Sequence, residues 1–298
     1  MIVGISVVKN EADVIETMAR HNLAYLDHLT IVDNGSADET VDVVQSLIDE
    51  GLPCALIQHP GTTHLQHVLI SDLVPSLVAT YDPDRIIPLD ADEFIVGDIG
   101  AFRREMQDRS IPLKLPWVTY VPMPDDDAAE TNVLKRIVNR RVSEVPQLYK
   151  ITVPAIAAVG AQVGPGSHRL HCNGKKVFMR VSASARLAHF PVRSAEQLIA
   201  KILIGSWSVR QRRRRRGEAY HWLDLAQRFL TSPTLRTAEM SQIALAYSGN
   251  ESTEVVRDPV STDIAVKMPV DPATTLLRKL IAYTEDLVRR SEGPLQGP

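Results

Sequence analysis

The sequence predicts an α/β fold, in which a mixed and mostly parallel sheet is flanked by helices and followed by a C-terminal helical extension. Two observations lead to this prediction. Over the first hundred residues, short apolar runs rich in β-branched residues alternate with longer segments of helical periodicity, as in chains that build parallel sheets. After Ser194 the strand-like runs give way to helical segments. We therefore expect two domains, 1–193 with the sheet and 194–298 as a helical extension packed on it.

The first ninety residues contain four predicted strands and three predicted helices. The strands are short, continuous apolar runs, typical of strands buried on both faces, and the helices repeat apolar residues with helical spacing. Gly35 favours a turn, Ser36 or Asp38 can cap the second helix, and Gly51 helps to end it. The predicted strands are 2–8, 29–32, 54–57 and 86–89, and the predicted helices are 12–25, one that ends near residue 50, and 64–80.

The rest of the chain is less regular up to residue 190 and mostly helical afterwards. A glycine-rich loop, 160–168, separates predicted strands, and a connector, 259–272, is expected to cross the surface. Further predicted strands are 114–121, 147–159, 177–181 and 183–188, with a helix at 98–109. The later predicted helices are 195–207, 218–230, 235–247 and 275–290, and 293–298 is expected to be a frayed tail.

The composition argues against several classes of protein. The net charge is −3, with 44% hydrophobic and 23% charged residues, which gives no reason to expect nucleic acid as a partner. The two cysteines, Cys54 and Cys172, lie far apart in sequence, so we expect no disulfide framework and a cytoplasmic location. The N-terminus lacks the basic region of a signal peptide, and no run reaches the roughly 20 apolar residues that span a bilayer. We expect a soluble protein.

One run of like charges, Arg212–Arg216, departs from this balance. A charge run is usually a solvated helix face, but arginines this dense repel one another and favour an anionic partner. That partner can be a nucleotide diphosphate, a phosphorylated acceptor or an anionic lipid surface. The last of these predicts peripheral contact with the inner face of a membrane.

Polar residues follow three of the predicted strands, as Lys9-Asn10-Glu11, Asp33-Asn34-Gly35-Ser36 and Asp90-Ala91-Asp92-Glu93. Ligands of parallel sheets bind beyond the carboxyl ends of the strands, so these clusters are expected along one edge. Buried carboxylates are costly unless a cation compensates, and Mg²⁺ and Mn²⁺ prefer carboxylate oxygen and bridge to phosphate. Asp90 and Asp92 are therefore predicted to hold a divalent metal. In isolation the same residues would be a helix cap and a solvated turn acid.

These segments resemble a known family. Val8-Lys9-Asn10-Glu11, 31–40 and 89–94 are similar in order and spacing to the nucleotide-binding half of the family 2-like glycosyltransferases, including their family 92 relatives. Residues 187–194 contain His-Phe-Pro-x-Arg-Ser, which resembles an element of the same group. The resemblance covers residues 1 to about 100 well and implies a GT-A-like, Rossmann-like catalytic domain over 1–193.

The resemblance also implies roles for individual residues. Glu11 and the Asp33-Asn34 turn would hold the base and ribose of a sugar nucleotide, although the family usually has a second Asp where this chain has Asn34. Asp90 and Asp92 would hold the diphosphate through Mn²⁺ or Mg²⁺, with His189 as the third metal ligand. The residues predicted to bind the nucleotide sugar are Val8, Lys9, Asn10, Glu11, Asp33, Asn34, Ser36, Asp90, Ala91, His168 and Arg193.

Three of the predicted site residues also have ordinary structural interpretations. A lone histidine such as His189 is more often a satisfied core residue than a ligand. Arg193 has the geometry to pair with phosphate oxygens, but an ordinary ion pair would also explain it. His168, in the glycine-rich loop, could contact the diphosphate or the acceptor, or simply be exposed on its loop.

The predicted function is that of a metal-dependent glycosyltransferase in glycan or glycoconjugate synthesis. Its expected donor is a UDP-sugar and its expected acceptor a hydroxyl of a saccharide or glycolipid, with inversion at the sugar carbon. Inversion requires a carboxylate that deprotonates the acceptor, and Asp125, Asp126, Asp127 and Glu93 are candidates. The predicted catalytic residues are Asp92, Glu93 and Asp127.

Two other functions compete with this interpretation. A sugar-phosphate nucleotidyltransferase would share the fold and the acid pair, but residues 9–13 lack the glycine-rich loop that holds a triphosphate. A non-catalytic nucleotide-sugar-binding protein would keep the pocket without turnover.

Overall fold

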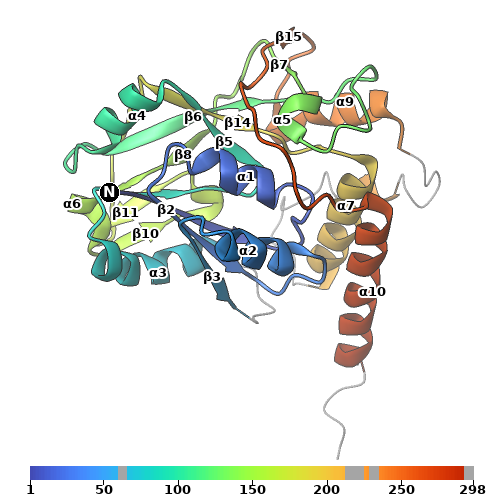
Figure 1. The fold of residues 1–298 in the computed structure, drawn as a ribbon, viewed down its shortest axis with the longest axis horizontal. Coiled ribbons are helices and arrows are strands. Elements are labelled where there is room, and N and C mark those ends of the chain that lie inside the picture. The colour runs from blue at the N-terminus through green and yellow to red at the C-terminus, as the bar shows by residue number, and fades with distance from the viewer. Residues whose placement is uncertain (60–65, 212–224, 228–234, 292–298) are drawn as a thin grey trace, which may run out of the picture.

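The computed structural model describes residues 1–59, 66–211, 225–227 and 235–291 of the 298. Its central sheet has five strands in the order β3-β2-β1-β4-β9 (Figure 1). β1 (Ile2–Val8), β2 (His28–Asp33), β3 (Cys54–Gln58) and β4 (Arg85–Pro88) are parallel, whereas β9 (Val153–Pro154) is antiparallel to β4. The predicted α/β class with a mostly parallel sheet flanked by helices is confirmed.

Helices cover both faces of this sheet. α1 (Ile15–Asn22) and α2 (Thr40–Asp49) lie on one face and α3 (Gln66–Tyr81) on the other (Figure 1). The alternation of side chains along β1 explains this arrangement, because Ile2 and Val8 join the core formed with α1 and α2, whereas Val3 and Ile5 join the core formed with α3. β1, β2 and β4 are therefore buried on both faces, as their continuous apolar sequences predict, whereas the edge strand β3 is only partly buried.

A second sheet continues the fold beyond Asp90. In it β14 (Ala185–His189) is parallel to β6 (Leu113–Thr119) and antiparallel to β5 (Glu93–Gly97). β8 (Tyr149–Ile151) and β13 (Arg180–Val181) also pair with β6, and α4 (Ile99–Met106) follows β5. The register sets His189 opposite Glu93, so β14 ends beside the acidic turn that follows β4.

Short elements occupy the periphery. They are α5 (Val133–Arg136), α6 (Ala155–Ala158), the 3-10 turn η1 (Pro165–Ser167), the β10 (Ala161–Val163), β11 (Leu170–Cys172) and β12 (Lys175–Lys176) sheet, and β7 (Asn139–Arg141) with β15 (Val255–Arg257). The antiparallel pairing of β7 with β15 ties the middle of the chain to its C-terminal region.

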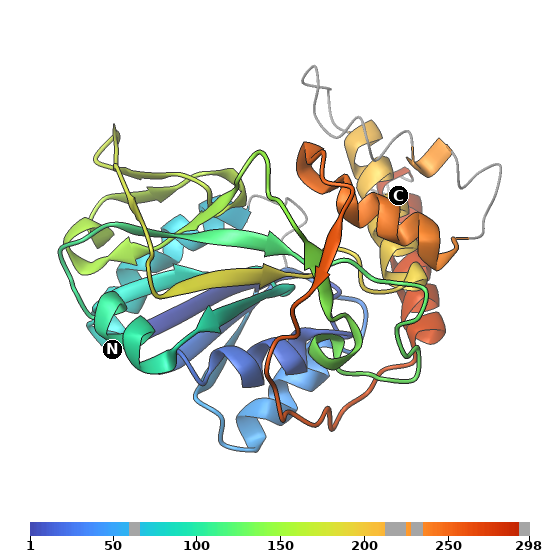
Figure 2. The same cartoon turned by 90° about the horizontal axis from the view of Figure 1, so that it is seen from above.

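The C-terminal region packs on the rest of the fold (Figure 2). α7 (Ala195–Gln211) contacts α10 (Pro272–Ser291), and α9 (Thr237–Leu245) leads into the 3-10 turn η2 (Tyr247–Gly249). The connector before α10 crosses α1, where the backbone N–H groups of Lys267 and Met268 donate to the Glu16 carboxylate at 2.9 to 3.1 Å. Cys54 and Cys172 are both free thiols.

The middle of the chain departs from the predicted elements in three places. The predicted strand 147–159 is divided into β8, which pairs with β6, and β9, which pairs with β4 in the other sheet. The helix α6 follows Pro154, which has no N–H with which to continue the ladder of β9. Within the predicted strand 177–181, the paired residues are Arg180 and Val181. β5 was not predicted, because its first residue, Glu93, reads as part of a polar turn.

Some predictions fall outside the described residues. The arginine run 212–216 and the tail 293–298 lie there, as does the predicted helix 218–230 apart from 225–227. Among the helices that the structure describes, none combines the length and hydrophobicity needed to cross a membrane.

Candidate functional site

A cavity of about 390 Å³ lies beyond the carboxyl ends of β1 and β4. Its lining residues from the region of the sheets are Val7, Lys9, Asn10, Glu11, Gln66, Asp90, Ala91, Asp92, Trp117 and His189. Those from the C-terminal region are Gln197, Ala200, Lys201, Ile204, Tyr247 and Lys279. The predicted boundary between 1–193 and 194–298 therefore runs through the wall of the cavity.

Two of the three predicted polar clusters, Lys9-Asn10-Glu11 and Asp90-Ala91-Asp92, meet at this cavity. They do so because β1 and β4 are adjacent parallel strands, whose carboxyl ends share one edge of the sheet. Asn10 has a left-handed φ of 61°, which asparagine tolerates better than most residues. Its N–H donates to Ser36 Oγ and its Oδ1 accepts the Ala37 N–H, both at 2.8 Å, so the loop is fixed by its own side chain.

The third cluster, Asp33-Asn34-Gly35-Ser36, does not line the cavity, contrary to expectation. The Asp33 carboxylate accepts the backbone N–H groups of Gly35 and Ser36 at 3.1 to 3.2 Å, and Asn34 is buried. This turn supports the Asn10 loop from behind. Val8 also differs from the prediction, because its side chain points into the core and the preceding Val7 lines the cavity.

Lys150 of β8 is fully buried behind Asp90. Its Nζ lies 2.6 Å from Asp90 Oδ2 and 3.0 Å from Glu93 Oε1. Gln66 Nε2 donates to the other Asp90 oxygen, Oδ1, at 2.6 Å. Burial opposes the charged form of Lys150, but the two carboxylates outweigh it and raise the pKa of the ammonium group. Lys150 is therefore a built-in counter-ion for this acidic corner.

Glu93 is fully buried in the same cluster, and its Oε2 accepts the Asp90 N–H at 2.8 Å. Burial raises the pKa of Glu93 to about 8, since it outweighs the opposing effect of Lys150. A protonated Glu93 beside the Lys150 ammonium and the Asp90 carboxylate leaves the cluster without net charge. Glu93 does not line the cavity, so, contrary to expectation, it is not placed to deprotonate an acceptor.

Asp127 and His168 also lie away from the cavity lining, contrary to the predictions. Asp127 is exposed on a loop, where its Oδ1 accepts the Ala129 N–H at 2.9 Å. His168 Nδ1 lies 2.8 Å from the Tyr149 carbonyl oxygen, and its ring packs edge-on against Trp117 with the ring centroids 5.2 Å apart. His168 thus supports Trp117, whose indole forms part of the wall.

Asp92 is buried where the two sheets meet. Its Oδ1 lies 3.7 Å from His189 Nε2, and its Oδ2 lies 3.6 Å from Arg193 Nη1 and 3.7 Å from Lys201 Nζ. Burial works against the ionised form, but the cationic neighbours, Lys201 and Arg193 among them, outweigh it and lower the pKa of Asp92. The carboxylate is therefore ionised at neutral pH, with a cationic surrounding.

His189 is packed among aromatic rings. Its ring stacks on Trp117 with centroids 4.2 Å apart and meets the ring of Tyr247 edge-on at 5.3 Å. Burial lowers the pKa of His189 to about 4 despite the opposing charge of Asp92, so the imidazole is neutral at pH 7. Its Nδ1 is buried and has no hydrogen-bond partner among the described residues. A neutral imidazole in this position can act as a metal ligand.

Arg193 is not open to the cavity, contrary to the expectation that it binds phosphate. Its Nε and Nη2 donate to the two oxygens of Asp13 at 2.7 and 3.0 Å, and Nη2 also donates to Glu11 Oε2 at 2.6 Å. Burial raises the pKa of Glu11 to about 7, whereas Arg193 overcomes burial at Asp13 and holds the pKa of that carboxyl at about 2. Arg193 thus joins the loop after β1 to the end of β14.

The three-residue metal site expected from Asp90, Asp92 and His189 is not assembled. Within the described ranges, no three His, Cys, Asp or Glu side chains are placed to hold one ion. Both Asp90 oxygens have other partners, Gln66 and Lys150. Asp92 and His189 do fit a divalent cation, because they offer one carboxylate oxygen and one neutral nitrogen 3.7 Å apart. A donor pair of this kind takes its other ligands from phosphate and water.

The cavity also contains residues that were not predicted, among them Trp117, Lys201 and Tyr247. The Lys201 ammonium lies 5.9 Å from the centroid of the Tyr247 ring. A signal for part of this wall is present in the sequence, since Gln197, Lys201 and Ile204 are spaced to share one face of a helix. These residues were not predicted to line the site, because 194–298 was predicted to be an extension apart from the catalytic domain.

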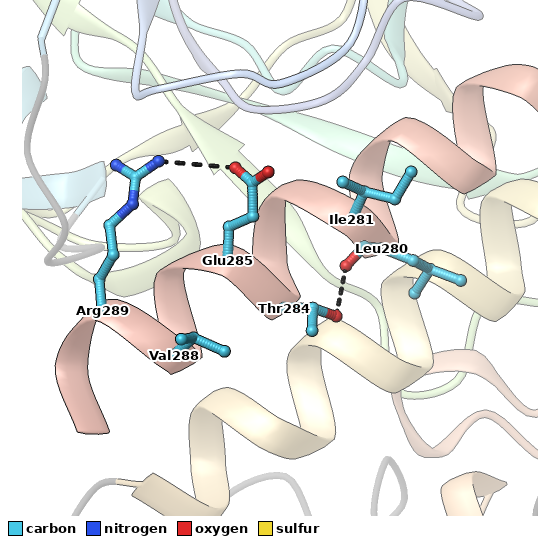
Figure 3. Close-up of a pocket in the computed structure, with 6 residues that line it drawn as sticks. All are labelled: Leu280, Ile281, Thr284, Glu285, Val288 and Arg289. Atoms are coloured by element: carbon cyan, nitrogen blue, oxygen red, sulfur yellow. Dashed lines mark hydrogen bonds and ion pairs between the residues drawn. The ribbon is translucent and has the colours of Figure 1, made fainter. Parts of the chain in front are cut away.

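A second hollow lies along α10, away from the acidic cluster (Figure 3). Its polar groups bond within the helix itself, because Thr284 Oγ1 donates to the Leu280 carbonyl at 2.8 Å and Arg289 pairs with Glu285 at 3.5 Å. The rest of its lining is apolar, from Leu280, Ile281 and Val288. It lacks the convergent polar groups of a catalytic site, so the cavity at the sheet edge is the candidate site.

Comparison with known proteins gives structural similarities at low sequence identity. No profile of a protein family matches the sequence, and no curated protein matches it. TarS of S. aureus matches over 84% of this chain and 46% of its own, with 12% identity and a TM-score of 0.39. GalNAc-T7 with UDP, GalNAc and Mn²⁺ matches over 83% of this chain and 56% of its own, with 10% identity and a TM-score of 0.40.

The mannosyltransferase PcManGT from Pyrobaculum calidifontis, in complex with GDP-Man and Mn²⁺, matches over 96% of this chain and 87% of its own. The identity is 11% and the TM-score 0.36. The chain spans about half the length of the first two of these proteins. Because the identities are 10–12% and the TM-scores 0.36–0.40, the functional argument rests on the residues of the cavity.

Proposed function

We propose that this protein is a glycosyltransferase with a GT-A-like fold, which moves a sugar from a nucleoside-diphosphate sugar to an acceptor hydroxyl. The observation that carries the proposal is the cavity beyond β1 and β4, where the carboxylates of Glu11 and Asp92 face the ammonium group of Lys201. Carboxylates accept hydrogen bonds from ribose and sugar hydroxyls, and an ammonium group pairs with phosphate. The volume, about 390 Å³, is within the usual range of small-molecule sites.

The residues of the cavity suggest how a donor would lie. We assign Lys9, Asn10 and Glu11 to the nucleoside, since the Asn10 loop is rigid and Glu11 is held by Arg193. We assign Asp92 and His189 to the diphosphate, through Mn²⁺ or Mg²⁺. Of the remaining predictions, a UDP-sugar as donor and a saccharide or glycolipid hydroxyl as acceptor belong to this proposal.

The reaction breaks the bond between the sugar carbon and a diphosphate oxygen, so negative charge grows on the departing nucleoside diphosphate. A divalent cation bound by Asp92 and His189 would offset that charge. Trp117 stacks on the ring of His189, Tyr247 meets that ring edge-on, and the two aromatic rings would limit the access of water to this corner. We propose inversion from the family resemblance, and the anomeric configuration of the product, read by NMR, tests it.

The first experiment measures thermal unfolding with UDP, GDP, ADP and dTDP and with UDP-sugars, each with and without Mn²⁺. A ligand at a hundredfold excess over its Kd stabilises the folded state by about 2.7 kcal/mol, which shifts the melting temperature by several degrees. Asp92→Asn should lose the Mn²⁺-dependent part of that shift. Asp49→Asn, which makes the same charge change on an exposed part of α2, is the control and should retain it.

The proposal fails if no nucleoside diphosphate or nucleotide sugar stabilises the wild-type protein. Turnover is a separate measurement, by release of UDP from a UDP-sugar with and without candidate acceptors. One observation favours a binding protein without turnover, namely that Glu93 and Asp127, two of the three predicted catalytic residues, do not line the cavity. Tight binding without release of UDP for any acceptor would establish that alternative. Release of pyrophosphate from UTP that depends on an added sugar 1-phosphate would indicate a sugar-phosphate nucleotidyltransferase.

A further inference from the structure

Asp92 has three cationic or ionisable neighbours, Arg193, Lys201 and His189, but forms no short contact with any of them. The distances from its oxygens to the nearest nitrogen of each are 3.6, 3.7 and 3.7 Å. These separations exceed the length of a hydrogen bond. The negative charge of Asp92 is therefore balanced by nearby positive charges without hydrogen bonds. A neighbour can move away from this carboxylate without breaking a hydrogen bond to it.

Two of the three neighbours are locked in place. Arg193 is bonded to Asp13 and Glu11 and its side chain is 1% exposed. His189 is stacked on Trp117 and its side chain is 2% exposed. Neither can turn toward a ligand without losing these contacts.

Lys201 differs from both. Its side chain is 31% exposed, comes from α7 and lines the cavity. Among the described residues, its closest carboxylate oxygen is Asp92 Oδ2, and its ammonium group also lies over the Tyr247 ring, 5.9 Å from the ring centroid. A lysine side chain is flexible, so its ammonium group can reorient within the cavity.

A diphosphate in this cavity would offer Lys201 a better partner than Asp92. Phosphate oxygens form charge-assisted hydrogen bonds of about 2.7–2.9 Å with an ammonium group, which the 3.7 Å contact with Asp92 does not match. Lys279 also lines the cavity, but its Nζ donates to the Asn10 carbonyl at 2.8 Å and lies 3.3 Å from Asp38. Moving Lys279 would release the Asn10 loop, whereas moving Lys201 would not.

We propose that Lys201 is an exchangeable counter-ion of Asp92, which neutralises this carboxylate in the nucleotide-free protein and turns to the diphosphate when a nucleotide binds. The inference rests on the proposed function and deepens it. The exchange frees Asp92, together with His189, for a divalent cation. Nucleotide and cation therefore bind cooperatively, and the residue that couples them comes from the C-terminal region.

The experiment measures Mn²⁺ binding by electron paramagnetic resonance and UDP binding by calorimetry, so neither readout depends on activity. Wild-type protein should bind Mn²⁺ at least about tenfold more tightly with UDP than without it. Lys201→Met should bind Mn²⁺ about tenfold more tightly than wild type in the absence of nucleotide, because Asp92 has lost a competing charge. In EDTA, the same variant should bind UDP about 10–100-fold more weakly, which corresponds to the loss of a charge-assisted hydrogen bond.

The matched controls separate this exchange from a general change in charge. Lys267→Met removes an ammonium group that pairs with Glu50 on the exposed surface and not with Asp92, and should not increase the Mn²⁺ affinity of the nucleotide-free protein. Lys201→Arg keeps the charge and should retain UDP binding within about fivefold of wild type.

Equal Mn²⁺ affinity in wild type and Lys201→Met, without nucleotide, would overturn the inference. If Lys201→Met does not fold, wild type alone decides, since the same Mn²⁺ affinity with and without UDP also overturns it. The two proposals fail differently. If no nucleoside diphosphate binds to wild type, the proposed function fails, and if UDP binds to wild type and to Lys201→Met with equal affinity, only the exchange fails.

Discussion

Replacing Lys150 with methionine is expected to destabilise the fold by about 3–5 kcal/mol at pH 8, the usual effect of removing one partner from a buried ion pair. The Lys150 ammonium donates a hydrogen bond to Asp90 Oδ2 at 2.6 Å and lies 3.0 Å from Glu93 Oε1. A hydrogen bond to a charged group contributes about 1.5–3 kcal/mol. Methionine keeps most of the apolar volume of the lysine stem, so the loss of packing is small. The destabilisation is therefore mainly electrostatic.

Protonation should reduce this loss at low pH. Glu93 can become neutral by taking up a proton, since burial already raises its pKa to about 8. Asp90 is partly exposed and keeps its hydrogen bond from Gln66, so it retains a partner without Lys150. At pH 5 the loss should be smaller than at pH 8 by only about 0.4 kcal/mol, because Glu93, with a pKa of about 8, is already half protonated in wild type at pH 8.

The assay is urea unfolding of wild type, Lys150→Met, Glu93→Gln and the double variant at pH 5 and pH 8. At pH 8, Glu93→Gln should offset part of the Lys150→Met loss, with a coupling energy of at least about 1 kcal/mol in the double-mutant cycle. Lys267→Met, which removes a lysine paired with Glu50 on the exposed surface, is the control and should leave stability nearly unchanged. A loss below about 1 kcal/mol at pH 8, or a loss that is larger at pH 5 than at pH 8, would refute the role of Lys150 as an internal counter-ion.

Three further predictions concern the same corner of the molecule. Arg193→Met should cost about 3–5 kcal/mol in urea unfolding, because Glu11 and Asp13 lose their buried partner, and Arg193→Lys should recover only part of it because lysine lacks the planar fork. The folded-state pKa of Glu93 is about 8 against an ordinary value of 4.5, so the folded protein keeps a proton that the unfolded chain releases between these values. Wild-type stability should therefore fall as pH rises from about 4.5 to 8, and a Glu93→Gln variant with the same slope would contradict the assignment. His189→Phe keeps a ring stacked on Trp117 but removes the nitrogen that faces Asp92, so calorimetry should show nucleotide binding that no longer strengthens with Mn²⁺. Unchanged Mn²⁺ dependence in that variant would exclude His189 as a ligand.

The first four strands and the helices between them follow from local sequence patterns. β1 occupies the predicted residues, and β2, β3 and β4 differ from their predicted bounds by one residue at one or both ends. Continuous β-branched runs and helical periodicity depend on residues a few positions apart, so they can be read directly. The same local reasoning places Lys9-Asn10-Glu11 and Asp90-Ala91-Asp92 at one sheet edge, because adjacent parallel strands end together.

Local sequence patterns do not predict the side-chain environment of a residue that has several possible hydrogen-bond partners. Asp33 lies at the end of its strand, as predicted. Its carboxylate accepts hydrogen bonds from the backbone N–H groups of Gly35 and Ser36 in its own turn, so it does not line the cavity. Glu93 lies only one residue beyond Asp92, yet antiparallel pairing with β14 makes it the first residue of β5 and buries it. In both cases the sequence predicts the position of the residue along the chain correctly. It does not predict the direction of the side chain, which the pairing of the strands and turns decides.

The sequence by itself determined the α/β class, the positions of the polar clusters after three of the strands, and the concentration of carboxylates after β1 and β4. Tertiary structure decided which charges compensate them. Burying carboxylates requires a cation, and the sequence suggests a metal for Asp90 and Asp92, whereas the folded chain brings Lys150 to Asp90, Arg193 to Glu11 and Lys201 to Asp92. Lys150 and Arg193 lie 60 and 182 residues from Asp90 and Glu11, to which they donate hydrogen bonds. No sequence periodicity extends over such separations. Only packing of the second sheet and α7 against the first brings these charges together.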